Sequence, residues 1–128
     1  MDIKQLESSL KMENFYFSHC SIDRKENISE RELKVNIKRK ASKLEEHVYE
    51  VALNVNIDSK DFYVTVIANA KFIYEAESYE QEAVIIKKNT IAIMFPFVRS
   101  QISLLTTQPG MMPVVLPPIN TAKFDEEE

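Results

Sequence analysis

Hydrophobic and polar residues alternate along most of the first 75 residues of this chain. The alternation is clearest over residues 48–57, where one face carries Tyr49, Val51, Leu53, Val55 and Ile57. A strand patterned in this way has one covered face and one solvated face, as strands of antiparallel sheets do. The pattern predicts four strands, over residues 14–22, 33–38, 48–57 and 62–75, which form one antiparallel sheet within residues 14–75.

The N-terminal part of the chain gives two further predictions. Strict alternation in the first strand would place Phe15 and Phe17 on one face and Cys20 and Ile22 on the other. Upstream of this strand, apolar residues recur at helical spacing and predict a short helix within residues 1–13.

From residue 78 the period becomes helical, and residues 78–107 form the predicted helical region. A short helix is expected over Ser78–Lys87, followed by a longer one capped by Asn89. Its apolar stripe consists of Ile91, Phe95, Val98, Ile102 and Leu105. Pro96 lies inside this stripe and is expected to kink or restart the helix, because proline removes one backbone hydrogen bond.

Prolines dominate the segment that follows, so residues 108–124 are predicted to form an irregular loop, followed by an acidic tail over residues 125–128. Strands followed by helices, without alternation of the two, indicate an α+β fold with the helix packed on one side of the sheet. The chain of 128 residues is expected to be one domain, residues 1–128.

Composition narrows the classes of function. The net charge of −4 argues against nucleic acid as the main partner, because binding phosphates takes a basic surface. No apolar run approaches the roughly twenty residues that cross a bilayer, so membrane insertion is not expected. The single cysteine, Cys20, and a start without an apolar signal segment fit a reducing compartment. These features predict a cytoplasmic protein.

Candidate chemical groups are sparse. Gly110 is the only glycine, which excludes the glycine-rich loops that hold nucleotide phosphates. His19 and Cys20 are neighbours on a strand and point to opposite faces, while His47 beside Glu45 and Glu46 is expected at the surface. Two histidines and one cysteine at this spacing do not make a zinc site. We expect no enzyme activity, no cofactor and no metal.

Five short segments, in order, resemble the SecB family of export chaperones. They are Val48–Leu53, Phe72–Ile73, Phe95–Arg99, Pro113–Leu116 and Leu116–Asn120. The resemblance covers roughly residues 44–124, about two thirds of the chain. It implies a four-stranded antiparallel sheet, a long helix that packs subunits together, and a homo-oligomer that is a dimer of dimers. It also implies that the protein keeps newly made polypeptides unfolded until export, without ATP.

The chain departs from the family in three places. The first strand and the charged connection after it match only loosely, and the family's aromatic groove-lining residue there has no counterpart unless Ile28 serves. The family continues with a second long helix that partly covers its client groove, whereas here only Thr121–Phe124 and four acids remain, so a more open groove is expected. The positions that dock the SecA motor hold His19, Asp23, Tyr63 and Thr65, which keep one acid of three. Docking of a SecA-type motor would therefore rest on Asp23 and Tyr63.

An apolar loop rich in Met accepts many sequences, because the Met side chain is flexible and polarisable. The residues predicted to contact clients are Ile28, Leu33, Val35, Met111, Met112, Val114, Val115, Leu116, Ile119 and Phe124. The residues predicted at the subunit interface are Ile91, Phe95, Phe97, Val98, Ile102 and Leu105. The structural alternative is that residues 111–119 pack over the chain's own sheet.

Three hypotheses for function stay open at this point. The first is an ATP-independent chaperone for exported proteins, with unfolded polypeptides as partners. The second is a chaperone of the same type dedicated to one partner, such as an antitoxin. The third is a small module that binds an apolar ligand between sheet and helix.

Overall fold

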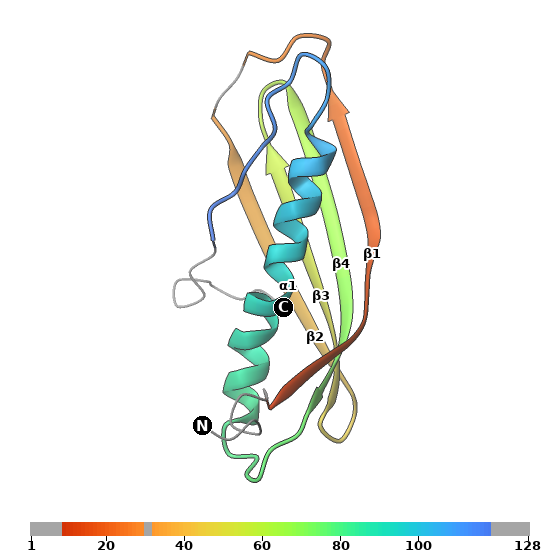
Figure 1. Cartoon of the computed structure of the whole chain (residues 1–128), viewed down its shortest axis with the longest axis vertical. Helices are drawn as coiled ribbons and strands as arrows, with labels where there is room; N and C mark the ends of the chain where they lie inside the picture. The colour runs from red at the N-terminus through yellow and green to blue at the C-terminus, as the bar shows by residue number, and fades with distance from the viewer. Residues whose placement is uncertain (1–8, 30–31, 119–128) are drawn as a thin grey trace, which may run out of the picture.

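The computed structural model describes residues 9–29 and 32–118 and shows a sheet with one helix across it (Figure 1). The elements are β1 (Leu10–Arg24), β2 (Lys34–Glu45), β3 (Val48–Asp58), β4 (Phe62–Tyr74) and α1 (Glu82–Leu105). All pairs in the sheet are antiparallel and the strand order is β1-β4-β3-β2. The predicted α+β fold, with four antiparallel strands and a long helix on one face, is confirmed.

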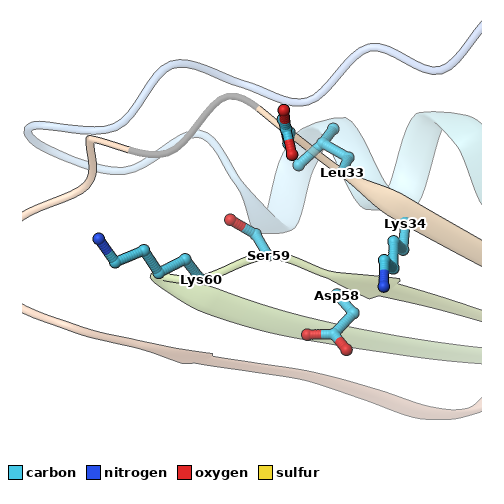
Figure 2. A pocket seen from close by; sticks show the side chains of 6 residues that line it. Leu33, Lys34, Asp58, Ser59 and Lys60 are labelled. Atoms are coloured by element: carbon cyan, nitrogen blue, oxygen red, sulfur yellow. The ribbon is translucent and has the colours of Figure 1, made fainter.

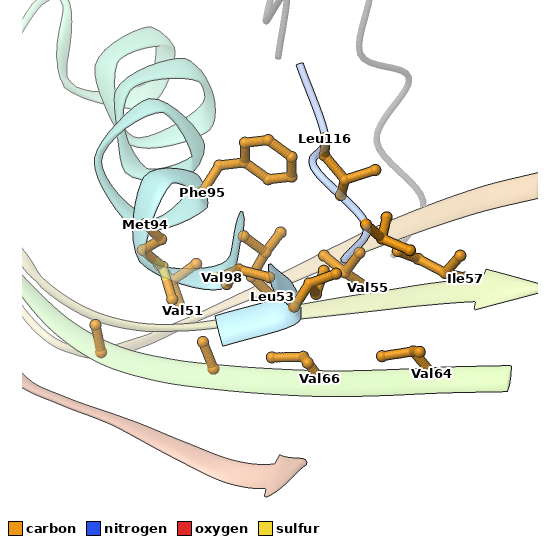
Figure 3. Close-up of a cluster of buried hydrophobic side chains, with 14 of the residues drawn as sticks. Val51, Leu53, Val55, Ile57, Val64, Val66, Met94, Phe95, Val98 and Leu116 are labelled. Carbon is orange, nitrogen blue, oxygen red and sulfur yellow. The ribbon is translucent and has the colours of Figure 1, made fainter. Parts of the chain in front are cut away.

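The core lies between α1 and the two central strands (Figure 3). Alternate residues of β3 and β4 point toward the helix, and their side chains are fully or almost fully buried: Val51, Leu53, Val55, Ile57, Val64, Val66, Ala68, Ala70 and Phe72. From α1, Met94, Phe95, Val98 and Ile102 close the core from above. The alternation in residues 48–57 and 62–75 thus identified the buried face of both strands.

The first strand departs from strict alternation. Its register with β4 shifts between Glu13 and Tyr16, and again between Phe17 and His19. Each shift inserts one residue and moves the following side chains to the other face of the sheet. Phe17 therefore faces the helix side opposite Ala68, and so does Ile22 opposite Val64. The prediction that Phe17 and Ile22 lie on opposite faces is wrong.

The predicted helix within residues 1–13 is wrong for its described end. Leu10 pairs with Tyr74 and Met12 pairs with Phe72, so this segment extends β1. Leu10 is buried in the core, and the ladder with β4 satisfies the backbone that a helix would have used. Residues 1–8 lie outside the described part of the chain.

The helical region forms one helix and not two. It begins at Glu82, so the short helix over Ser78–Lys87 and the cap at Asn89 are wrong, and it continues through Pro96 to Leu105. Pro96 has no backbone N–H, so the helix lacks the hydrogen bond that residue 96 would donate to the carbonyl of Ala92. Buried residues on both sides of Pro96, such as Ile91 and Val98, hold the two halves against the sheet and offset this cost.

The chain turns sharply after α1. Gly110 has a φ of +75°, which a glycine adopts without strain, and the Met111 N–H donates to the carbonyl of Gln108 at 3.1 Å. From Met111 the chain runs back beside the helix, on the side of β2 (Figure 1). We call residues 111–118 the return segment.

Candidate functional site

The return segment alternates between buried and exposed side chains. Met111, Val114 and Leu116 are buried in the core cluster, whereas Met112 and Val115 are 66% and 77% exposed. Val114 sets this alternation, because both of its backbone groups bond to the last turns of α1. Its N–H donates to Thr106 Oγ1 at 2.8 Å, and its carbonyl accepts from Ser103 Oγ at 2.9 Å.

The connection between β1 and β2 is held by hydrogen bonds to Asp61, in the turn between β3 and β4. The carboxylate of Asp61 accepts from the N–H of Ser29 at 2.8 Å and from its hydroxyl at 3.2 Å. The Lys25 N–H donates to the carbonyl of Asp61 at 2.9 Å. These bonds hold Ile28 against the core beside Phe62.

Arg24 joins the two sides. Its Nη1 donates to Gln108 Oε1 and to the carbonyl of Pro109, each at 3.2 Å. Its Nη2 donates to the carbonyl of Glu26 at 3.0 Å. One guanidinium therefore ties the β1–β2 connection to the turn after α1, and fixes the width of the space between them.

That space is an apolar pocket of about 240 Å³, lined by Ile28, Leu33, Phe62, Met112, Pro113, Val114 and Val115. We call it the apolar groove. Leu33 also lines a neighbouring hollow of about 480 Å³, together with Glu32, Lys34, Asp58, Ser59 and Lys60 (Figure 2). Val115 also lines a pocket of about 390 Å³ that includes Leu104. The apolar groove is therefore the centre of a longer track, with mixed charges at the hollow beyond Leu33.

The structure brings together part of the predicted client-contact set. Ile28, Leu33, Met112, Val114 and Val115 line the apolar groove, while Met111 and Leu116 point into the core as the structural alternative described. Val35 is 44% exposed on β2, and Ile119 and Phe124 lie outside the described residues. Phe62 also lines the apolar groove, but the sequence did not predict this. Its place in the alternating pattern of residues 62–75 indicated only a core position.

Most of the residues predicted at the subunit interface are buried within the chain itself. Ile91, Phe95, Val98 and Ile102 are covered within the chain itself, and Leu105 is half-buried. Phe97 is 49% exposed, and the centroid of its ring lies 4.9 Å from the ring centroid of Phe15 on β1. Phe97 is thus the member of the set that is open to a second subunit.

The four positions of the suspected docking surface lie together on the outer face of the sheet. Asp23 pairs with Tyr63, and the neighbouring pair is Ser21 with Thr65. His19 Nε2 lies 3.0 Å from Ser21 Oγ. Tyr63 is 41% exposed, so the surface is accessible.

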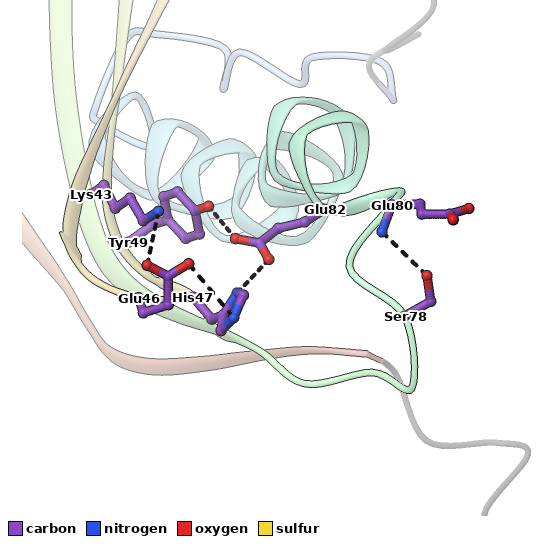
Figure 4. Close-up of polar contacts among 7 residues, drawn as sticks. All are labelled: Lys43, Glu46, His47, Tyr49, Ser78, Glu80 and Glu82. Atoms are coloured by element: carbon purple, nitrogen blue, oxygen red, sulfur yellow. Dashed lines mark hydrogen bonds and ion pairs between the residues drawn. The ribbon is translucent and has the colours of Figure 1, made fainter.

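A polar cluster at the other end of the molecule was not anticipated (Figure 4). Glu82, in the first turn of α1, is buried and accepts a hydrogen bond from the Tyr49 hydroxyl; its Oε1 lies 2.5 Å from His47 Nδ1. Burial alone would raise the pKa of Glu82, but the bonds from Tyr49 and His47 outweigh it and hold that pKa below its usual range. Burial, together with Glu82, raises the pKa of Tyr49 to about 12.

The side chain of His47 is 26% exposed, so it reaches the surface but is partly covered by its partners. Its ring stacks on Tyr79 with 3.9 Å between centroids. The partners Glu82 and Tyr79 follow more than thirty residues later in the chain, so no local pattern could reveal them. The cluster fastens the β2–β3 turn to the start of the helix.

The described residues hold little that resembles a reactive site. His19 and Cys20 face opposite sides of the sheet, opposite Ile67 and Val66. No group of three His, Cys, Asp or Glu residues within ranges 9–29 and 32–118 is placed to hold a metal ion. No helix in the same ranges combines the length and the apolar character needed to cross a bilayer.

A protein-family model matches nearly the whole chain. The family described as "Preprotein translocase subunit SecB" matches residues 4–127. A curated relative, the uncharacterized protein MJ0357 of Methanocaldococcus jannaschii, is 53% identical over 34 residues, which are 27% of this chain. The match spans only 22% of that relative's length.

Solved structures also align with this chain. The SecB-like chaperone Rv1957 of Mycobacterium tuberculosis, in complex with a ChAD peptide from the HigA1 antitoxin, aligns with a TM-score of 0.67 at 11% identity; 91% of this chain and 92% of that one are covered. A Streptococcus agalactiae protein of unknown function aligns with a TM-score of 0.48 at 14% identity, covering 84% of this chain and 96% of the other.

Proposed function

This chain belongs to the SecB family, and on that premise we propose that it is a chaperone that holds unfolded polypeptide segments in the apolar groove. The observation that carries the proposal is the position of Met112 and Val115. Both are large apolar side chains, more than half exposed, on a segment whose backbone is fixed to α1. Exposed apolar groups that gather in one groove are typical of a surface for apolar partners.

The groove fits a client that exposes apolar side chains. Its walls are aliphatic, aromatic and thioether groups, and a Met at the rim adapts to side chains of different shape. A pocket of about 240 Å³ accepts only a few side chains, so each contact is weak. Weak contacts repeated over several subunits give tight but reversible holding, because linked sites bind at high effective concentration.

Holding of this kind needs no ATP, and the chain with its single glycine contains no glycine-rich phosphate loop. We propose that the protein acts in the cytoplasm as a homo-oligomer, a dimer of dimers, and keeps exported proteins unfolded. Transfer to a SecA-type motor would use the outer face of the sheet around Asp23 and Tyr63, which are register partners.

A second candidate is a chaperone of the same type dedicated to one partner, such as an antitoxin. The likeness to Rv1957, whose structure holds an antitoxin peptide, favours it. The outer face of the sheet also favours it, because His19, Tyr63 and Thr65 stand where the resemblance would place acids and a leucine. Binding of a SecA zinc-tail peptide to the purified protein would support the export role, whereas its failure to bind would favour the dedicated one.

The third hypothesis, an apolar ligand between sheet and helix, finds no support among the described residues. Leu53, Val55, Met94 and Val98 fill the space between α1 and the central strands, and each is fully buried (Figure 3).

The test of the proposed function is aggregation of a denatured model protein, followed by light scattering. The purified chain should suppress aggregation at a near-stoichiometric ratio, equally with and without ATP. No suppression at excess chaperone would contradict the proposal, and suppression only with ATP would contradict its mechanism.

A further inference from the structure

The sheet has an open edge along β2 (Figure 1). The strand order β1-β4-β3-β2 gives β2 a single neighbour, and in residues 9–29 and 32–118 no backbone hydrogen bond joins β2 to a segment other than β3. In an antiparallel pair, the N–H and C=O groups of every second residue point away from the partner strand. The outer edge of β2 therefore presents a row of backbone groups with which another strand can pair.

The two edges of the sheet differ in regularity. β1, at the opposite edge, has two register shifts against β4, and such bulges interrupt a pairing edge. β2 keeps one unbroken register with β3 from Lys34 to Lys43, and its shift comes only after Lys43. Of the residues in β2, all except Ile37, Arg39 and Ala41 are exposed. β2 is thus the straight and accessible edge.

This edge is continuous with the apolar groove. Leu33 lines the groove and directly precedes β2. Val35 and Ile37 follow on the face of β2 that looks toward α1, because they pair with Ile57 and Val55 of the core face. Val35 is 44% exposed. An extended chain that leaves the groove at Leu33 can therefore continue beside β2, with apolar side chains against Val35 and Ile37.

The charge of β2 disfavours a second copy of this chain at the edge. Residues 34–43 include five Lys or Arg and no acid, although the whole chain has a net charge of −4. Lys38 and Lys40 lie on the outer face, opposite the neutral residues Asn54 and Ala52. Pairing of two copies of β2 would bring lysines together, which destabilises a strand pair. A strand with acids on its outer face fits this edge instead.

We propose that a client segment held at one end in the apolar groove pairs with the open edge of β2 as a fifth strand. The inference rests on the proposed function and specifies how the client's backbone is bound. Backbone hydrogen bonds form with clients of many sequences, whereas side chains set the preference among them. The preferred segment alternates apolar residues, which face the side of α1, with acids, which face the outer side.

The probe is a labelled ten-residue peptide in which Val and Glu alternate, and its binding to the full chain is followed by fluorescence anisotropy. N-methylation of every second residue removes the N–H groups along one edge of an extended peptide. Methylation of one set should weaken binding at least about tenfold, because the hydrogen bonds to β2 are lost, and methylation of the other set should leave it nearly unchanged. Equal binding of the two methylated peptides would overturn the inference and leave the proposed function standing. Binding of none of the peptides, the unmethylated one included, would overturn both.

Hydrogen exchange of the β2 amides, measured by NMR, locates the added strand. With the Val-Glu peptide bound, every second amide over residues 34–43 should exchange at least about tenfold more slowly than in the free protein, because it gains a hydrogen bond. Unchanged exchange at saturating peptide would overturn the inference. Slow exchange of these amides before peptide is added would also overturn it. Such protection would assign the edge to a segment of the chain itself, or to a second copy where it grows with protein concentration.

Matched variants test the preference for acids. The double variant Lys38→Glu, Lys40→Glu, at exposed positions, should bind the Val-Glu peptide about tenfold more weakly and a Val-Lys peptide more tightly. The control Lys11→Glu, Lys88→Glu makes the same change of charge at exposed positions of β1 and α1. Its binding of both peptides should stay close to that of the unchanged protein. Equal effects of the two double variants would overturn the preference for acids beside β2.

Discussion

The hydroxyl of Thr106 accepts a hydrogen bond of 2.8 Å from the backbone N–H of Val114, and both residues are buried. The same hydroxyl donates to the carbonyl of Ile102 at 2.8 Å, so one side chain closes α1 and fixes the return segment. With Val114 fixed, Met112, which lies two residues before it, and Val115, which follows it, face outward. The exposed apolar side chains thus depend on a polar contact beneath them.

The substitution Thr106→Val should weaken both folding and binding. It leaves the buried Val114 N–H without its acceptor, at a cost of about 1–3 kcal/mol in the free energy of unfolding. Urea unfolding measures the loss, and peptide anisotropy should show weaker binding to the folded variant. Thr107→Val, which removes an exposed hydroxyl bonded to Ser103, is the control and should cost less. Equal effects of the two substitutions would contradict the role given to Thr106.

Stability should follow the alternation of the return segment. Leu116 is 6% exposed and Val115 is 77% exposed. Leu116→Ala should therefore lower the free energy of unfolding by about 2–4 kcal/mol, because it leaves a cavity in the core. Val115→Ala should change it by less than about 0.5 kcal/mol, as surface substitutions do. A similar loss for both would mean that the segment packs in another way.

Low pH should weaken the contacts of Glu82 with His47 and Tyr49. Because the folded-state pKa of this carboxyl lies below its unfolded-state value, it contributes stability at neutral pH that is lost as the pH falls through the acid range toward the folded-state value. Glu82→Gln should lower stability at pH 7 and flatten the acid limb of a plot of unfolding free energy against pH. Exposed Glu80 supplies the control, Glu80→Gln. An acid limb unchanged by Glu82→Gln would refute the assignment.

Assembly should depend on the exposed ring of Phe97. This ring and that of Phe15 form an aromatic patch where α1 crosses β1. In a homo-oligomer, Phe97→Asn should reduce the molar mass measured by static light scattering, because it removes apolar area from the contact. Val84→Asn changes another half-exposed residue of α1 and should leave the mass unchanged. A mass that Phe97→Asn does not alter would place the interface elsewhere.

The sheet was accessible from sequence because its signal is local. Buried positions in β3 and β4 recur every second residue, and a two-residue period is visible within one strand. The bulges in β1 were not accessible, because they arise where β1 meets β4 about fifty residues later. The continuity of α1 through Pro96 also depends on packing against the sheet and not on helix propensity.

For the candidate site too, local features could be predicted from the sequence, whereas features set by tertiary packing could not. Residues of the return segment were recognised as apolar and irregular, but their orientation is set by Thr106 and Ser103 on the helix. Phe62 lines the groove because the tertiary fold brings β4 next to the return segment, which its local sequence does not indicate. The cluster around Glu82 joins three segments, so neither His47 nor Tyr49 carried a local sign of it.

The most direct test of the central claim is binding of a labelled apolar peptide to a groove variant. The double substitution Met112→Asn, Val115→Asn removes two exposed apolar side chains and leaves the core untouched. Leu44→Asn removes a comparable exposed side chain at the end of β2, outside the groove, and serves as the control. Client holding by the apolar groove predicts about tenfold weaker binding for the double variant and unchanged binding for the control. Unchanged binding by the folded double variant would contradict it.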